Sequence, residues 1–183
     1  MFERGFKAWC EKLALQYRKD LGRRPIDPLT HTDVAKHLGI TVCSTSDFPE
    51  LSAEARRNLG AEDAGWSAVT LDSGGGKLII VNHTHSERRR SSDIMHEVAH
   101  HILEHQPSEI ELSAEGLLML ETYSRKQEEE ADWLAGCLLL PRPALVHIRK
   151  RFRDYEEAAE RYLVSMAMLK YRLDVSGVNY QFR

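Results

Sequence analysis

The chain has 183 residues, enough for one domain of ordinary size, and its 42% hydrophobic and 29% charged residues are typical of a globular protein. The formal net charge of −3 provides no overall attraction to nucleic acid or anionic lipid. The charged N-terminus lacks the apolar segment of a signal peptide, and no apolar run approaches the roughly 18 residues that a membrane span needs. Three widely spaced cysteines form no C-x-x-C pair, which argues against a disulfide framework or a thiolate zinc site. We therefore expect a single-domain cytoplasmic protein (residues 1–183) without membrane contacts.

The first third of the chain, residues 1–65, is expected to be helical. Aromatic and apolar residues recur at spacings of three and four, which predicts an amphipathic helix over residues 2–21. Thr30 or Thr32 can cap a second, short helix over residues 33–38, and Gly39 ends it. The stretch from there to about residue 65 has no clear pattern.

Residues 66–82 predict two strands. The segments WSAVTL and KLIIV alternate in the manner of strands and are joined by the turn sequence DSGGG. The second segment, Lys77 to Val81, directly precedes the helices described below. It is a candidate for an edge strand that holds an extended peptide, although an ordinary core strand explains it equally well.

The rest of the chain is expected to be mainly helical, with prolines between the helices. The periodicity predicts helices over residues 92–105, 109–124, 127–139, 143–153 and 155–173, the last with a break near residue 164. We group these as zinc-site helices (91–141) and C-terminal helices (142–183). The predicted fold class is α+β, a helix-rich domain with a small twisted sheet.

The central motif is S-S-D-I-M-H-E-V-A-H-H-I-L-E-H, in which Ser91 or Ser92 is the expected N-cap of a helix. Residues four apart lie about 40° apart around a helix axis, so His96 and His100 present two imidazoles to one point, as a tetrahedral zinc site requires. Glu97 lies beside this pair and can accept a proton from a water at the metal as a general base. The alternative is a solvated helix face with surface histidines.

A catalytic zinc needs a third protein ligand, and the segment Q-E-E-E-A-D-W-L-A-G supplies the candidates. Glu128 and Asp132 are four apart, and Ala131 permits close packing on their side of the helix. We therefore predict Glu128 as the third ligand and Asp132 as the carboxylate that orients a histidine ligand. Glu130 is the second choice of ligand.

Together, the two motifs resemble the ImmA/IrrE family of metallopeptidases, and the closing Y-L-V-S-M-A-M-L-K-Y-R-L-D-V-S-G resembles the end of that family. The resemblance extends from about residue 6 to the C-terminus. It implies a gluzincin-like fold, zinc held by His96, His100 and a glutamate of E-E-E-A-D, and Glu97 as the base. It also implies limited cleavage of a helix-turn-helix repressor or antitoxin in stress responses or other transcription regulation. The length of the chain leads us to expect that this partner is separately encoded.

Three further residues are candidate donors to the oxyanion of a cleaved carbonyl, namely Tyr123, His83 and His147. Their spacing selects none of them. For each, a structural role is the simpler interpretation.

The C-terminal segment offers a competing interpretation. Its two helices have the spacing of a helix-turn-helix, with Arg161, Lys170 and Arg172 as candidate phosphate contacts, which would make the protein a DNA-binding regulator. The second helix begins with Met166, Ala167 and Met168, which cannot hydrogen-bond to base edges, so we do not expect direct DNA binding. A metal-binding regulator that sequesters its partner without cleaving it is the other alternative. The oligomeric state is left open.

Overall fold

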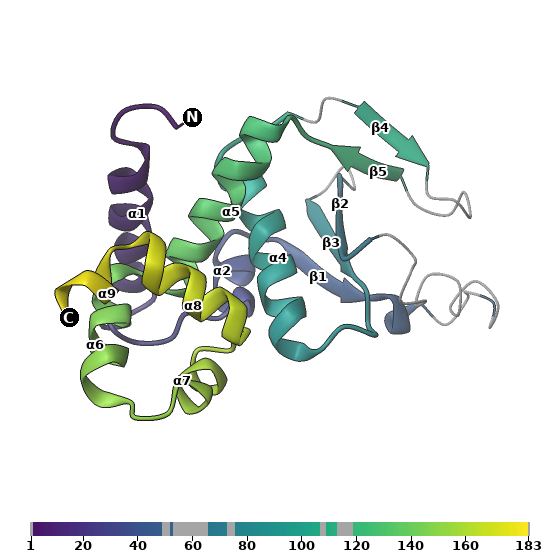
Figure 1. Cartoon of the computed structure of the whole chain (residues 1–183). Coiled ribbons are helices and arrows are strands. Elements are labelled where there is room, and N and C mark those ends of the chain that lie inside the picture. The colour runs from purple at the N-terminus through teal and green to yellow at the C-terminus, as the bar shows by residue number, and fades with distance from the viewer. Residues whose placement is uncertain are drawn as a thin grey trace.

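The computed structural model describes residues 2–48, 52, 66–72, 76–106, 109–112 and 119–182. Along the chain the elements are α1 (Phe6–Asp20), α2 (His31–His37), β1 (Thr41–Ser44), a 3-10 turn (Thr45–Asp47), β2 (Ala68–Asp72), β3 (Lys77–Val81), α4 (Glu87–Ile102), β4 (Glu109–Leu112), β5 (Met119–Thr122), α5 (Arg125–Leu139), α6 (Arg142–Arg151), α7 (Tyr155–Arg161), α8 (Met166–Val175) and α9 (Val178–Gln181). The expected α+β class is confirmed: α4 lies between a small sheet and α5, and α6 to α9 lie beyond α5 (Figure 1). None of the helices in the described part combines the length and apolar character that crossing a lipid bilayer requires.

The sheet has the strand order β1-β3-β2, with β1 parallel and β2 antiparallel to β3. Of the two interpretations of Lys77–Val81, the edge strand is therefore wrong and the ordinary core strand is confirmed, because β3 is hydrogen-bonded on both sides. β2 is the edge strand that lies on the side of α4. β1 was not expected, since its four residues are too few to establish an alternating pattern.

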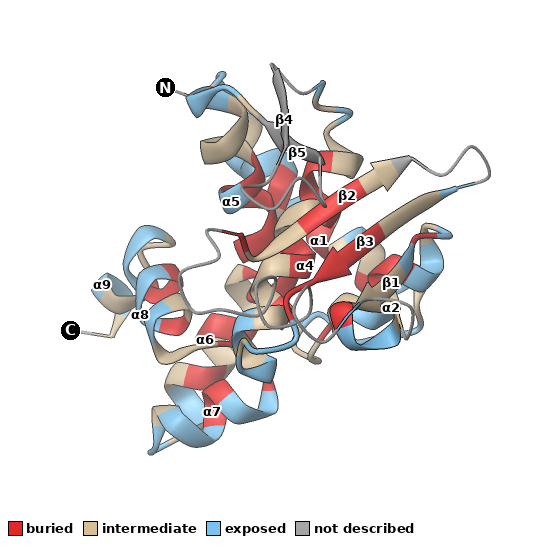
Figure 2. Ribbon diagram, turned by 90° about the vertical axis from the view of Figure 1, so that its right-hand side faces the viewer, coloured by how far each residue is buried: buried red, intermediate tan, exposed pale blue. Residues whose placement is uncertain are grey.

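The core lies between the sheet and the helices. Ile79 and Val81 of β3 join Ile94, Met95 and Val98 of α4 in the main apolar cluster. The side chains of Ile80 and Val69 belong to a second, smaller cluster on the other face of the sheet. In Figure 2 the buried residues accordingly gather on β3 and on the helices behind it.

Three other predictions about the helices need correction. The helix predicted over residues 109–124 is wrong, because β4 and β5 pair there as antiparallel strands. The segment E-I-E-L alternates with a period of two, which is the period of a strand. The helix α4 begins five residues before the predicted start, and its N-cap is Ser86, whose hydroxyl accepts from the Arg89 amide, rather than Ser91 or Ser92. The short helix α9 was not expected.

Two fully buried arginines hold the C-terminal end of α5. The Arg18 guanidinium of α1 donates to the carbonyl of Leu139 (3.2 Å), and that of Arg172 of α8 donates to the carbonyl of Leu140 (3.1 Å). Arg172 also donates to the Glu11 carboxylate at 2.8 Å. The last carbonyls of a helix have no partner within it and carry partial negative charge, so these contacts stabilise the helix end. They tie α1, α5 and α8 together and fix the helix that carries Glu128.

Arg172 crosses α5 at Gly136, where no larger residue fits. A Cβ atom at Gly136 would lie 2.7 Å from Cδ of Arg172. We expect Gly136→Ala to destabilise the fold, because a steric cost of about 1–3 kcal/mol exceeds the gain of up to about 1 kcal/mol in helix propensity. Urea unfolding measures the change.

The matched control is the same substitution in an Arg172→Ala background. There the clash is gone, so Gly136→Ala should stabilise the protein through helix propensity alone. An equal effect in both backgrounds would show that Arg172 does not determine the need for glycine.

Candidate metal centre

The helices α4 and α5 pack against each other and bring His96, His100 and Glu128 together. Nε2 of His96 lies 3.0 Å from Nε2 of His100 and 3.1 Å from Oε2 of Glu128. Nε2 of His100 lies 3.9 Å from the same Glu128 oxygen. Two imidazoles and one carboxylate, from residues at most 32 positions apart in the chain, thus form a small triangle of donor atoms.

The dimensions of this triangle suit a divalent metal ion. In a tetrahedral zinc site with bonds of about 2.0–2.1 Å, neighbouring donor atoms are about 3.3–3.4 Å apart. The three observed separations of 3.0, 3.1 and 3.9 Å lie on both sides of that value. Three protein ligands of this kind leave a fourth position for a reactant, as in catalytic sites.

The ring of His96 is oriented by Asp132. Nδ1 of His96 donates to Oδ1 of Asp132 at 2.9 Å, and α5 supplies Asp132 one turn after Glu128. With its proton on Nδ1, His96 presents the lone pair of Nε2 to the triangle. Burial lowers the pKa of His96, but the hydrogen bond and the charge of Asp132, with the charges of Glu97 and Glu128, raise it overall above the ordinary value.

His100 has a different environment. Its side chain is almost completely buried, and the ring of Tyr123 stacks on it with centroids 3.8 Å apart. Burial, with the neighbouring charges of His96 and His105, lowers the pKa of His100 to about 3. His100 is therefore neutral near pH 7, which is the state that binds a metal.

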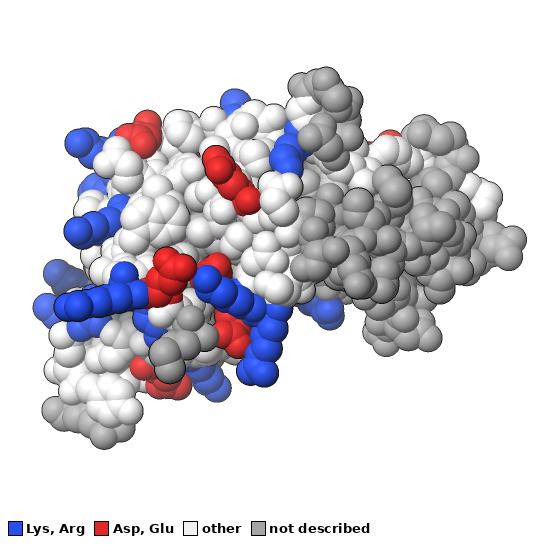
Figure 3. Space-filling model, turned by 90° about the horizontal axis from the view of Figure 1, so that it is seen from above, with Lys and Arg blue, Asp and Glu red and all other residues white. Residues whose placement is uncertain are grey.

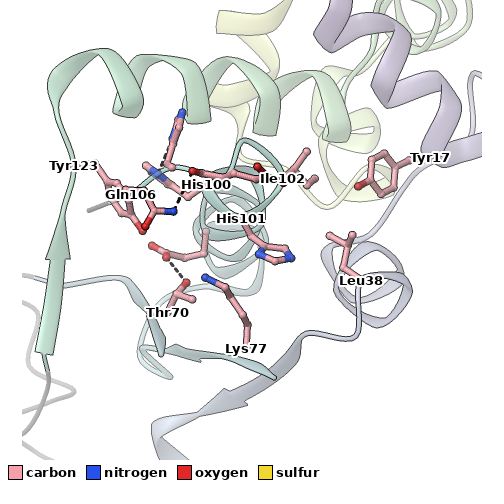
Figure 4. A pocket seen from close by; sticks show the side chains of 12 residues that line it. Tyr17, Leu38, Thr70, Lys77, His100, His101, Ile102, Gln106 and Tyr123 are labelled. Atoms are coloured by element: carbon pink, nitrogen blue, oxygen red, sulfur yellow. Dashed lines mark hydrogen bonds between the residues drawn. The ribbon is translucent and has the colours of Figure 1, made fainter. Parts of the chain in front are cut away.

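Glu97 lies beside the triangle, and a residue of the sheet hydrogen-bonds to its carboxylate. The hydroxyl of Thr70 on β2 donates to Oε2 of Glu97 at 2.6 Å. Figure 4 shows this contact inside a cavity of about 460 Å³, which His100, His101, Lys77 and other residues line. A second cavity of about 280 Å³ lies on the side of His96 and also includes Glu97. Glu97 thus lines both cavities.

The three candidate oxyanion donors differ in their position relative to the two cavities. Tyr123 lines the larger cavity, whereas His83 hydrogen-bonds to Thr45 (2.6 Å) and His147 packs against Phe152. Neither His83 nor His147 is among the described residues that line the two cavities at Glu97.

Sequence analysis did not identify Thr70, Lys77 and His101 as site residues. Their positions in the larger cavity come from the pairing of β2 with β3 and from the packing of the sheet on α4. His101 lies in the quoted motif directly after His100, but its spacing from His96 did not single it out, and Thr70 and Lys77 belong to no motif.

Comparisons with known proteins agree with this geometry. The sequence model of the family Peptidase_M78, described as the IrrE N-terminal-like domain, matches residues 35–174. Among solved structures, the chain is similar to one described as a Mycobacterium tuberculosis transcriptional regulator, with a TM-score of 0.52 and 15% identity over 94% of this chain and 47% of that one. The chain thus spans about half the length of that protein, and at this identity the likeness shows a shared fold. No curated protein matches.

The ligand role of Glu128 can be tested with its neighbour as control. We expect Glu128→Gln to weaken zinc binding by more than about 100-fold, because loss of a ligand should exceed the 10- to 100-fold cost of losing an orienting residue. Glu129→Gln removes the same charge one residue away, where the carboxylate faces Arg125 on the surface. It should change the affinity by no more than about threefold. Competition with a chromophoric chelator measures both, and equal losses would contradict the assignment.

The pH dependence of zinc binding should reflect His96 alone. Because His100 has a pKa of about 3 and that of His96 is raised above its ordinary value, His96 is the histidine ligand that must release a proton when zinc binds in weakly acidic solution. The dissociation constant should therefore rise about tenfold for each pH unit below the pKa of His96. In Asp132→Asn the rise should begin at lower pH, since Asp132 raises that pKa. A hundredfold rise per unit would show that both imidazoles titrate.

Proposed function

The chain belongs to the peptidase family of IrrE N-terminal-like domains, and on this basis we propose that it is a zinc-dependent endopeptidase that makes a limited cut in a regulatory protein. The observation that carries the proposal is the position of Glu97. Glu97 follows His96 of the His96–His100–Glu128 triangle, and it lines both the cavity at His100 and the cavity at His96. We infer that these two cavities hold the two sides of a peptide bond.

The residues of the site have separate tasks in this reaction. A divalent metal held by the triangle would act as a Lewis acid and lower the pKa of a water molecule. Glu97 accepts the proton from that water as it attacks the carbonyl carbon, and delivers it to the leaving amine. The hydrogen bond from Thr70 holds one carboxylate oxygen of Glu97 and so orients the carboxylate. Tyr123 is the candidate donor to the oxyanion that lies in the cavity.

The edge strand β2 supports a peptide substrate. Ala68 lines the smaller cavity and Thr70 lines the larger one, so the strand runs past both sides of Glu97. Among the described strands, β2 forms a ladder with β3 only, and β5 lies close to it. We infer that an extended segment forms main-chain hydrogen bonds with the other edge of β2. A substrate bound in this way is recognised in an unfolded or locally opened stretch.

We infer that the substrate is a helix-turn-helix repressor or an antitoxin, as the resemblance to the ImmA/IrrE family implies. The similar solved protein is described as a transcriptional regulator. Cleavage of a repressor would connect the peptidase reaction to transcription regulation, for example in a stress response.

The structure weakens the DNA-binding alternative. Arg172, one of its three candidate phosphate contacts, is fully buried and bound to Glu11 and the end of α5. On the face shown in Figure 3, the described Lys and Arg side chains lie among Asp and Glu residues and form no continuous basic surface. Lys170 and Arg161 remain exposed, but they do not by themselves make a groove-reading surface.

The peptidase and the sequestration hypotheses differ in their dependence on Glu97. We expect Glu97→Gln to retain zinc and the fold but to abolish cleavage, because the amide cannot accept a proton. Labelling of new protein N-termini in cells that produce the wild type or the variant identifies both the substrate and the cut bond.

Glu87→Gln is the matched control, because it makes the same change at the exposed start of the same helix, away from both cavities at Glu97. It should produce the same new N-termini as the wild type. If the Glu97→Gln protein relieves repression as the wild type does and no new N-terminus distinguishes them, the protein acts by sequestration and the peptidase proposal fails.

A further inference from the structure

We propose that His105 and Glu130 form a positioning pair for the metal ligand His100, so that each histidine of the triangle is held by its own carboxylate of α5. This inference rests on the proposed metal site and extends it to two residues outside the H-E-x-x-H motif. It also gives Glu130, the second choice of ligand in the sequence, a role of its own.

The end of α4 is shaped to bring His105 back to His100. The helix ends at Ile102, and Glu104 has a positive φ of 54°, a conformation that few residues other than glycine adopt. The turn is closed by a hydrogen bond from the backbone amide of His105 to the carbonyl of His100 at 3.1 Å. As a result the two imidazoles meet, with Nδ1 of His105 3.0 Å from Nδ1 of His100.

Glu130 completes the arrangement from the other helix. Oε2 of Glu130 lies 3.4 Å from Nε2 of His105. Both side chains are largely buried, with 13% and 8% exposed, which distinguishes this contact from a solvated surface ion pair. Oε1 of Glu130 faces Lys126 at 3.6 Å. The carboxylate of Glu130 therefore reaches His100 only through the ring of His105, whereas Glu128 reaches it directly.

The donor and acceptor roles in this chain have one consistent assignment. Nε2 of His100 faces His96 and Glu128, so it must carry the lone pair and Nδ1 must carry the proton. Nδ1 of His105 must then accept the hydrogen bond from Nδ1 of His100. Because a neutral imidazole carries one proton, the proton of His105 lies on Nε2. That N–H is the one on the side of Glu130, whose carboxylate oxygen lies 3.4 Å from Nε2 and is the acceptor we assign to it. Each atom in the series His100–His105–Glu130 has a matching partner.

The pair should act on His100 as Asp132 acts on His96. A carboxylate that accepts a hydrogen bond from a ligand histidine fixes the tautomer and the ring orientation and raises the basicity of the coordinating nitrogen. Asp132 does this through one hydrogen bond. Glu130 does it through an intervening imidazole, which suits a ligand that lies deeper in the protein. Loss of His105 or Glu130 leaves all three proposed ligands in place but fixes the ring of His100 less well, so the affinity for the metal falls.

The test measures zinc affinity by chelator competition at one pH. Glu130→Gln and His105→Phe should each weaken binding by about 10- to 100-fold, the usual cost of removing a group that orients a ligand. The double variant should lose no more zinc affinity than the single variant that binds zinc more weakly, because both residues act through one series of hydrogen bonds. His105→Asn, which retains an acceptor for Nδ1 of His100, should lose less than His105→Phe.

Two controls separate positioning from general effects of charge. Glu129→Gln makes the same change on the exposed side of α5, and Lys126→Met removes the other partner of Glu130. Both should bind zinc within about threefold of the wild type. Circular dichroism of each variant without metal verifies the fold, which the nearly isosteric Glu130→Gln should preserve.

A second readout reports the tautomers directly. Long-range ¹H–¹⁵N correlation spectra of the zinc-loaded wild type should show a proton on Nδ1 of His100 and on Nε2 of His105, and in Glu130→Gln the Nε2 proton of His105 should exchange faster with water. The opposite tautomer of His105, or wild-type affinity in both Glu130→Gln and His105→Phe, would overturn the positioning role.

The failure of this inference can be distinguished from the failure of the metal site. If the wild type binds zinc, His96→Ala does not, and Glu130→Gln and His105→Phe bind it as the wild type does, only this inference fails. If the wild type binds no zinc, the metal site itself fails, and the positioning role with it.

Discussion

The close packing of α5 on α4 is the contact on which the rest of the site depends. Glu128 reaches the two histidines because small buried residues, Ala131 and Ala135 of α5 and Ala99 of α4, allow two helices to approach closely. The approach is held at a distance from the site, where the buried guanidinium groups of Arg18 and Arg172 bind the last carbonyls of α5. Burying two cations is costly unless they are paired and hydrogen-bonded, so the contacts of Arg18 and Arg172 with these carbonyls and with Glu11 favour one arrangement of α1, α5 and α8.

Three carboxylates of α5 contact different histidines of the candidate metal centre. Along α5, Glu128 faces both histidine ligands, Asp132 accepts from His96, and Glu130 contacts His105. Three carboxylates within five residues would repel one another if they shared one direction. Here each is directed to a different imidazole nitrogen, so the negative charge is distributed around the site.

The proposed base and the proposed surface for the substrate come from the other side of α4. Glu97 accepts a hydrogen bond from Thr70 of β2, which among the described strands pairs with β3 only. Packing of α5 on α4 thus brings the candidate metal ligands together, and packing of the sheet on α4 positions Glu97. α4 takes part in both contacts, so a single short motif on this helix can contain two candidate ligands and the proposed base.

The amino-acid sequence was enough to predict the relative directions of side chains that lie within about one turn of the same helix. His96, Glu97 and His100 share a helix, and Glu128 and Asp132 share another, so helical periodicity alone gives their relative directions. The same reasoning failed for residues 109–124, where a short alternating pattern competes with a helical one, and for β1, which has only four residues. The central position of β3, the contact of Thr70 with Glu97 and the path from His100 through His105 to Glu130 were decided only by the tertiary structure. Each of these joins elements that are distant in sequence, and such contacts depend on how whole elements pack, which no spacing of residues along the chain records.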